Sequence, residues 1–181
     1  AYGAQGIIIM DSAGAYLPYE VEERIKLLIT ALDIPVGFHG HNNLGMAVAN
    51  SISAVNAGAT IIDGTARGFG AGAGNTQLEV LVAVLEKLGV NTGINLYKML
   101  DASDIAEREL VESASTISSA SIISGLAGVF SGYIKHVNRV AQEFEVDPRD
   151  IFFEMGRRKI VAGQEDIIIE VATKLSRGSD K

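Results

Sequence analysis

Two patterns of apolar and polar positions alternate over the first half of the chain. Short runs rich in β-branched residues occur at 6–10, 35–41 and 60–64. Each run is followed by a longer segment with helical spacing of its apolar residues, at 18–32, 44–56 and 75–88. Strands that alternate with helices in this way are typical of βα units that share a parallel sheet. The pattern therefore predicts three such units in succession.

The second half of the chain shows helical spacing without strand signals. A serine-rich stretch at 113–124 predicts a connector, and we find no internal repeat. Apolar periodicity predicts four helices, at 96–110, 134–144, 147–155 and 165–175. We therefore expect two domains, an α/β domain over 1–92 and an appended helical domain over 93–181.

Three parallel strands joined by right-handed crossovers fit two architectures, a doubly wound sheet and a (β/α)₈ barrel. Periodicity alone does not choose between them. In both architectures the loops after the carboxyl ends of the strands form the functional face. The polar residues at these ends are Asp11, Ser12, His39, His41, Asn42, Asn43, Asp63 and Asn75.

Charge and hydropathy exclude two kinds of partner. The 181 residues carry 15 Lys and Arg against 22 Asp and Glu, so the formal net charge is −7. Nucleic-acid binding needs clustered cations that release counterions, and this balance argues against it. The apolar stretches are far shorter than the ~20 residues of a membrane-spanning helix, and no signal segment opens the chain. We expect a cytoplasmic protein.

The chain contains no cysteine, and 48% of its residues are hydrophobic. Disulfides, thiolate nucleophiles and cysteine-based zinc sites are therefore excluded. Any metal ion must be held by imidazole, carboxylate, amide or water ligands.

His39 and His41 are the most informative pair in the chain. Residues two apart on a strand point to the same face, so both imidazoles should project together from the strand end. Two such groups can bind one divalent metal, or they can simply form hydrogen bonds at the end of a strand. The chain has three histidines, and the third, His136, is predicted to lie on a helix surface. We favour the metal-binding interpretation.

Glycines recur at every second position from Gly68 to Gly74, just before a predicted helix. Such a loop can cradle an anion, but it lacks the Lys-Ser/Thr pair of a P-loop and the spacing of a dinucleotide site. Close packing of the loop across a barrel mouth is the alternative. We expect Asn75 to cap the following helix. Ser12 could donate to a substrate carboxylate or cap the next turn.

Several segments together resemble those of the 4-hydroxy-2-oxovalerate aldolases, metal-dependent class II aldolases related to hydroxymethylglutaryl-CoA lyase and isopropylmalate synthase. The resemblance covers essentially the whole chain. The segments are MDSAG at 10–14, GFHGHNNLG at 37–45, AVANS at 47–51, GAGAGN at 70–75, GRRK at 156–159 and GQED at 163–166.

This resemblance implies the C-terminal three βα units of a (β/α)₈ TIM barrel, strands six to eight, followed by an α-helical C-terminal domain. It implies cleavage of a 4-hydroxy-2-oxoacid to pyruvate and a short aldehyde, in the catabolism of aromatic hydrocarbons. His39 and His41 match the metal ligands of the family, usually around Mn²⁺. Ser12, His39 and Phe130 match substrate-binding positions, and Asn75 matches an asparagine near the metal. The helical domain would contact an acylating acetaldehyde dehydrogenase and channel the aldehyde to it.

Two positions depart from the family pattern. Phe130 stands where the family has a tyrosine that reaches the substrate, and Tyr133, one helical turn further, could supply the lost hydroxyl. Arg67 stands where the family has a small residue, which adds a cation to the loop after the last strand.

The length of the chain conflicts with a complete barrel, which needs about 250 residues. The family's metal-binding aspartate, its arginine and its catalytic histidine all come from the first strand, and no segment here matches it. We therefore expect a C-terminal half that is inactive alone and is completed by an N-terminal half or a homo-oligomer. The alternatives are an acyl-CoA lyase or Claisen-type synthase of the same superfamily, and a non-catalytic interaction module.

Overall fold

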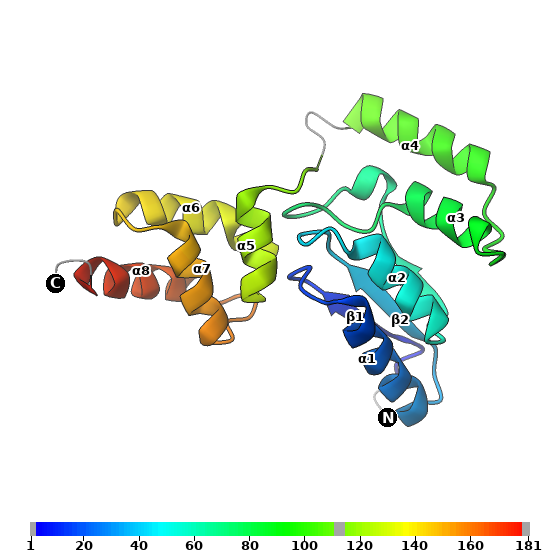
Figure 1. Ribbon diagram of the computed structural model, residues 1–181, viewed down its shortest axis with the longest axis horizontal. Coiled ribbons are helices and arrows are strands. Elements are labelled where there is room, and N and C mark those ends of the chain that lie inside the picture. Colours follow the sequence, from blue (N-terminus) through cyan, green and yellow to red (C-terminus); the bar gives the residue numbers. More distant parts are fainter. Residues whose placement is uncertain (1–2, 111–114, 179–181) are drawn as a thin grey trace.

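The computed structural model describes residues 3–110 and 115–178. Its parallel sheet has the order β1-β2-β3. The strands are β1 (Ile7–Asp11), β2 (Val36–Gly40) and β3 (Ile61–Asp63), and the helices that follow them are α1 (Pro18–Ala31), α2 (Ala47–Asn56) and α3 (Leu78–Lys87) (Figure 1). This succession confirms the three βα units and the α/β fold that the apolar pattern predicts.

The register of the sheet brings the polar strand ends together. Met10 of β1 pairs with His39 of β2, and His39 pairs with Asp63 of β3. Because the strands are parallel, their carboxyl ends meet at one edge of the sheet. The loops that carry the candidate residues therefore lie side by side.

One face of the sheet is covered and β1 is largely uncovered. Val36 and Phe38 of β2 are buried with Val21 and Ile25 of α1 and with Ala54 of α2. By contrast, three of the four apolar side chains of β1 are exposed, while Ile9 packs against this core. The exposed fractions are 39% for Ile7, 38% for Ile8 and 59% for Met10. The edge strand of this sheet thus presents apolar side chains that a complete (β/α)₈ barrel would bury.

A second apolar core lies among the helices near the C-terminus (Figure 1). It includes Val137, Phe152, Met155 and Val171, all with at most 1% exposure. Among the described residues, no helix is long and apolar enough to cross a bilayer. The elements are α5 (Ser119–Ala127), η2 (Ser131–Tyr133), α6 (Ile134–Glu143), α7 (Pro148–Arg157) and α8 (Asp166–Gly178).

Helix α4 (Leu96–Leu110) lies apart from these C-terminal helices. It packs against α3 and against the short helix η1 (Ala66–Gly68), on the side of the α/β region (Figure 1). Its buried side chains include Ser103 and Ala106. The start of α4 at residue 96 agrees with the sequence pattern, and its packing links it to the loop after β3.

The prediction that the serine-rich stretch is a connector is wrong over part of its length. Residues 119–124 belong to α5, whose N-cap is Ser118. The Ser118 side chain accepts a hydrogen bond from the Ser121 amide, and the Ser121 hydroxyl accepts one from the Ser118 amide. This reciprocal capping box starts a helix where serine content alone suggests a loop. The first two positions of the stretch, 113 and 114, lie outside the described residues.

Asn75 is not the helix cap that the sequence suggests. Helix α3 begins at Leu78 with Gln77 as its N-cap residue, because 75–77 run extended beside neighbouring loops. Asn75 forms an isolated antiparallel bridge with His41, and Gln77 forms a parallel one with Thr65. The glycine-rich segment therefore ends in a short extended stretch against β2.

Candidate metal and substrate site

His39 lies at the carboxyl end of β2 with only 8% of its surface exposed. Its Nδ1 lies 3.0 Å from Oδ2 of Asp63, the residue opposite it at the end of β3. An ionised carboxylate accepts hydrogen bonds, so this contact places the ring proton on Nδ1 and the lone pair on Nε2. A second-sphere carboxylate of this kind is typical of metal-ligating histidines.

His41 follows the strand by one residue and is equally buried, at 8% exposure. Its Nδ1 lies 3.3 Å from the carbonyl oxygen of Ala71 in the glycine-rich loop. A carbonyl can only accept, so Nδ1 donates and Nε2 again keeps its lone pair. Burial lowers the pKa of His41, and the nearby His39 lowers it further, against the raising effect of the Ala71 carbonyl. The ring is therefore held in the neutral form that binds metals.

The two rings lie together, as their spacing predicts. Their centroids are 5.2 Å apart, with an angle of 69° between the ring planes. In each ring the hydrogen bond is made by Nδ1, which leaves Nε2 available to another partner. Sequence reasoning named Asp63 as a strand-end residue but missed its partner. The strand register could have identified this partner, because a parallel strand next to β2 must end beside His39.

Asn75 supplies an unpaired oxygen beside His41. Its Nδ2 donates to the carbonyl of Phe69 at 2.7 Å, while Oδ1 is buried without a partner among the described residues. A buried amide oxygen without a partner is costly, so it suits a ligand or water. No group of three or more His, Asp or Glu able to hold a metal occurs in the described part of the chain. The donors here fit a divalent ion as part of a larger ligand set.

Asn43 is a residue whose role sequence reasoning missed. It is fully buried, and its Nδ2 donates to the Ala13 carbonyl at 2.8 Å and to the hydroxyl of Ser131. Its Oδ1 accepts from the Ala73 amide at 3.0 Å. Asn43 thus joins the loops after all three strands to the helical region. A polar residue with no exposed surface needs such partners, but only the tertiary structure identifies them.

Asn43 and its partners Ala13, Ala73 and Ser131 form a hydrogen-bond hub, and the glycine-rich loop packs tightly over it. Gly72 has φ +66°, and a Cβ there would come within 2.5 Å of Asn43 Oδ1 and 2.7 Å of Ser131 Cβ. Neither the backbone angle nor the space admits another residue without strain. Close packing, rather than an anion cradle, accounts for this glycine.

Ser12 and Phe130 line one cavity of about 400 Å³ between the loop after β1 and the helical region. His39 and His41 do not line this cavity, so the structure groups the four predicted residues in two pairs. The remaining lining residues are Met10, Asp11, Ala13, Ala15, Tyr16, Gly128, Ile160, Val161 and Ala162.

Asp11 supports the wall of this cavity. Its carboxylate is 2% exposed and accepts from the amides of Ala15 at 2.9 Å and Tyr16 at 3.0 Å. Burial raises the pKa of Asp11, although these amide hydrogen bonds oppose the rise. Its backbone carbonyl accepts from the His41 amide at 3.3 Å. Asp11 shapes the loop that carries Ser12 and ties it to the histidine pair.

Tyr133 does not replace the hydroxyl that Phe130 lacks. Its ring packs edge-on against Phe130, with centroids 5.7 Å apart. Its hydroxyl donates to the Val161 carbonyl at 2.7 Å and accepts from the Gln164 amide at 3.0 Å. The hydroxyl therefore orders the loop at 161–164. This loop forms part of the cavity wall.

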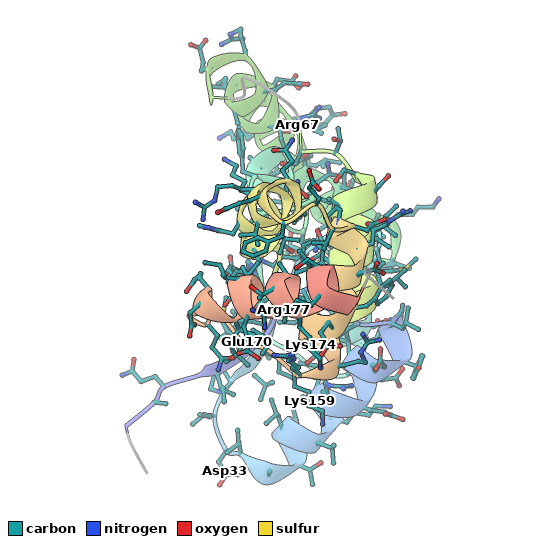
Figure 2. All side chains as sticks on the ribbon, turned by 90° about the vertical axis from the view of Figure 1, so that its left-hand side faces the viewer. Asp33, Arg67, Lys159, Glu170, Lys174 and Arg177 are labelled. Atoms are coloured by element: carbon teal, nitrogen blue, oxygen red, sulfur yellow. The ribbon has the colours of Figure 1, made fainter. Side chains whose placement is uncertain are left out.

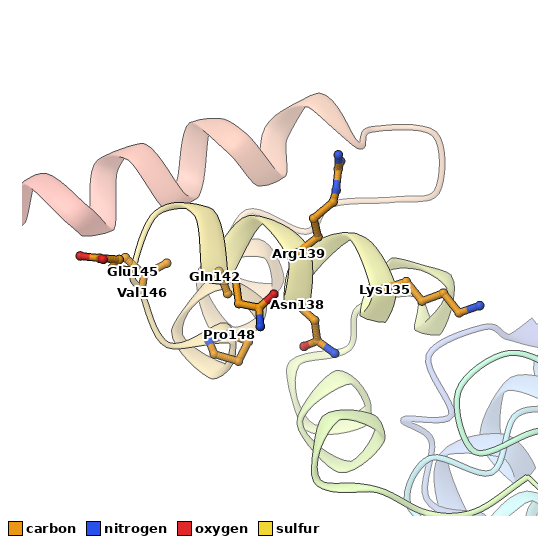
Figure 3. A pocket seen from close by; sticks show the side chains of 8 residues that line it. Lys135, Asn138, Arg139, Gln142, Glu145, Val146 and Pro148 are labelled. Carbon is orange, nitrogen blue, oxygen red and sulfur yellow. The ribbon is translucent and has the colours of Figure 1, made fainter.

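A separate hollow of about 680 Å³ lies over α6 (Figure 3). Lys135 and Arg139, one turn apart, flank Asn138 and point away from one another. His136 lies exposed on the same helix, as predicted. This open, mixed-charge surface is remote in the sequence from the histidine pair.

Comparisons with known proteins identify the family of this chain. The family described as HMGL-like matches residues 1–106, and the DmpG-like communication domain matches residues 115–177. The 4-hydroxy-2-oxovalerate aldolases of Pectobacterium atrosepticum and Streptomyces tendae are each 64% identical to this chain, over 180 and 179 residues. Each match covers 99% of the chain. The chain spans about half the length of these relatives, 52% and 50%.

Among solved structures, the carboxyl transferase domain of Rhizobium etli pyruvate carboxylase superposes with a TM-score of 0.78. The match is 19% identical and covers 97% of this chain and 32% of that one. The fold is therefore that of the last three βα units of a TIM barrel followed by helices. The chain belongs to the HMGL-like family. This membership confirms the resemblance that the sequence segments predict.

Proposed function

We propose that this chain carries the C-terminal half of the active site of a metal-dependent 4-hydroxy-2-oxoacid aldolase. Within it, residues 1–92 form part of the barrel and 93–181 form the helical domain, whose first helix, α4, packs on the barrel side. The observation that carries the proposal is the pair of buried imidazoles whose Nδ1 atoms are both occupied, by Asp63 and by Ala71. The names of the 64% identical relatives support the reaction.

His39 and His41 would hold the metal through Nε2. Asn75, which forms a bridge with His41, would assist through its unpaired Oδ1. Mn²⁺ is the ion we propose, since it accepts mixed imidazole and oxygen ligands. When bound, such an ion polarises the 2-oxo group and stabilises the charge left on pyruvate when the carbon–carbon bond breaks. The remaining ligands and the catalytic base would come from the first strand of the barrel, outside this chain.

Ser12 and Phe130 would hold the substrate. The Ser12 hydroxyl can donate a hydrogen bond to a carboxylate, and the Phe130 ring offers an apolar surface for the alkyl end. His39 does not line the cavity that contains Ser12 and Phe130; it would act on the 2-oxo end of the substrate from the metal side. The shared cavity of about 400 Å³ is large enough for a short oxoacid.

The exposed side chains of β1 support completion of the barrel by further strands. Ile7, Ile8 and Met10 lie on an edge strand with unpaired backbone groups on its outer side. An N-terminal half would pair with this edge and bury these side chains. A homo-oligomer and a cytoplasmic location are part of the same proposal.

The helical region would bind an acylating acetaldehyde dehydrogenase, which would receive the aldehyde. The match of residues 115–177 to the DmpG-like communication domain supports this partner. The cavity that contains Phe130 reaches the 160–162 loop of that region, which supports a substrate site that continues into the partner-binding domain.

Mn²⁺ binding to the isolated chain tests the ligand assignment. Titration followed by electron paramagnetic resonance should show binding that the His39→Ala/His41→Ala double variant abolishes. Asp63→Ala should weaken it about tenfold, because the His39 ring loses its orienting partner. His136→Ala is the matched control and should bind like the wild type. Unchanged Mn²⁺ affinity in the double variant would overturn the assignment.

A further inference from the structure

Arg67 begins the loop that carries the hydrogen-bond partner of His41. It lies in η1 with a φ of +55°, a left-handed conformation that non-glycine residues rarely adopt. Such a conformation is strained and persists where the surroundings hold it in place. The contacts of Arg67 therefore indicate what the residue does.

Two carboxylates hold Arg67, one at its backbone and one at its side chain. Its amide donates to Oε2 of Glu79, on the first turn of α3, at 3.1 Å. Glu79 is 5% exposed. The Arg67 guanidinium donates to Oε1 of Glu107 on α4 at 2.8 Å. In Figure 2, Arg67 lies toward the end of the molecule where α4 packs. Through these two contacts Arg67 connects η1 to both α3 and α4.

The loop beyond Arg67 returns to the histidine pair. The Gly68 carbonyl accepts from the Asn75 amide at 2.9 Å, and the Phe69 carbonyl accepts from Asn75 Nδ2 at 2.7 Å. Two residues on, the Ala71 carbonyl accepts from His41 Nδ1. A shift of η1 would therefore move both Asn75 and the acceptor that orients His41.

We propose that Arg67 is a positioning residue for the metal site. Its ion pair with Glu107 and its backbone contact with Glu79 anchor the glycine-rich loop, and the anchored loop holds His41 with Nε2 free for the metal. The added cation is therefore not directed at the substrate. This inference rests on the proposed metal site, because it assigns Arg67 a role toward the same imidazole.

Arg67→Ala tests this connection, because alanine keeps the same left-handed backbone cost while it removes the ion pair. In metal-free protein, hydrogen exchange of the loop amides at 69–75 should become roughly two- to fivefold faster. Mn²⁺ affinity should fall by a similar factor, roughly two- to fivefold. The Nδ1–H resonance of His41 should shift or broaden, which a merely structural change elsewhere would not cause.

Matched variants separate the explanations. Arg108→Ala, which removes a neighbouring arginine that pairs with Glu109 on α4, should leave all three readouts unchanged. Arg67→Lys, and the charge swap Arg67→Glu with Glu107→Arg, should restore most of the loop protection. Wild-type loop exchange and His41 resonance in Arg67→Ala would overturn the inference. Failure of the proposed function is read separately, as unchanged Mn²⁺ binding in the His39→Ala/His41→Ala variant.

Discussion

At the scale of single residues, the direction in which each imidazole presents its lone pair determines what the site can bind. The spacing of His39 and His41 predicts that their rings lie together. It does not say which ring nitrogen is free, because that depends on Asp63 and Ala71, 24 and 30 residues further along the chain. Tertiary contacts of this range have no local signal.

Asn43 provides a test of the hydrogen-bond hub. Replacing it with alanine leaves the buried Ala73 amide without its acceptor and removes the donor to the Ala13 carbonyl and to the Ser131 hydroxyl, which keeps its bond to the Ser12 carbonyl. We expect Asn43→Ala to lower the free energy of unfolding by about 2–3 kcal/mol, since each unsatisfied buried group costs about 1–3 kcal/mol. Urea unfolding followed by circular dichroism measures this change.

The exposed Asn138 on α6 offers the matched control for this prediction. Asn138→Ala should change the free energy of unfolding by less than about 0.5 kcal/mol, as expected for a surface position. Equal effects of the two substitutions would show that the hub does not contribute to stability.

At the scale of elements, α7 shows how a cap determines where a helix begins. Asp147 is the N-cap, its carboxylate accepts from the Arg149 amide at 2.9 Å, and Pro148 follows at the first helical position. The Arg149 side chain and amide both donate to this carboxylate and lower the pKa of Asp147 to about 2. The apolar pattern predicts a helix over 147–155, so the predicted start lies one residue before the observed one, and Asp-Pro is the local signal that marks the boundary.

Asp147→Ala should cost about 1 kcal/mol of unfolding free energy at neutral pH. A depressed pKa means that the carboxylate stabilises the fold above its ordinary pKa of 3.8 and loses this effect as the pH falls toward 2. The difference between wild type and variant should therefore shrink between about pH 4 and pH 2. Asp101→Ala, at an exposed position of α4, is the control. A difference that does not change with pH would contradict this explanation.

Most elements were predictable from local patterns, and the errors have local causes. The strand and helix order follows from apolar periodicity, and the helix at 96–110 agrees at both ends. The serine-rich helix α5 was missed because its capping box resembles a loop in composition. Asn75 was misplaced because a polar residue before a helix resembles a cap, whereas here the bridge with His41 competes successfully.

At the scale of the whole molecule, the apolar pattern predicted the three strands that are present but not the architecture to which they belong. Periodicity left a doubly wound sheet and a barrel open, and the resemblance of the sequence segments favoured the barrel. The exposed apolar side chains of β1 agree with a sheet that continues beyond this edge. The packing of α4 on η1 could not be predicted, because it brings together residues such as Arg67 and Glu107, 40 residues apart.

The proposed reaction belongs to the complete barrel, so the sharpest test completes it. A hybrid chain can place the N-terminal half of the Pectobacterium atrosepticum relative before residue 1. The rate of pyruvate release from 4-hydroxy-2-oxovalerate with Mn²⁺ is then followed by a coupled lactate dehydrogenase assay. We predict Mn²⁺-dependent release that His39→Ala and His41→Ala each reduce at least about 100-fold, while His136→Ala retains it. A folded hybrid that releases no pyruvate, or that releases it at the same rate without the two histidines, would contradict the account.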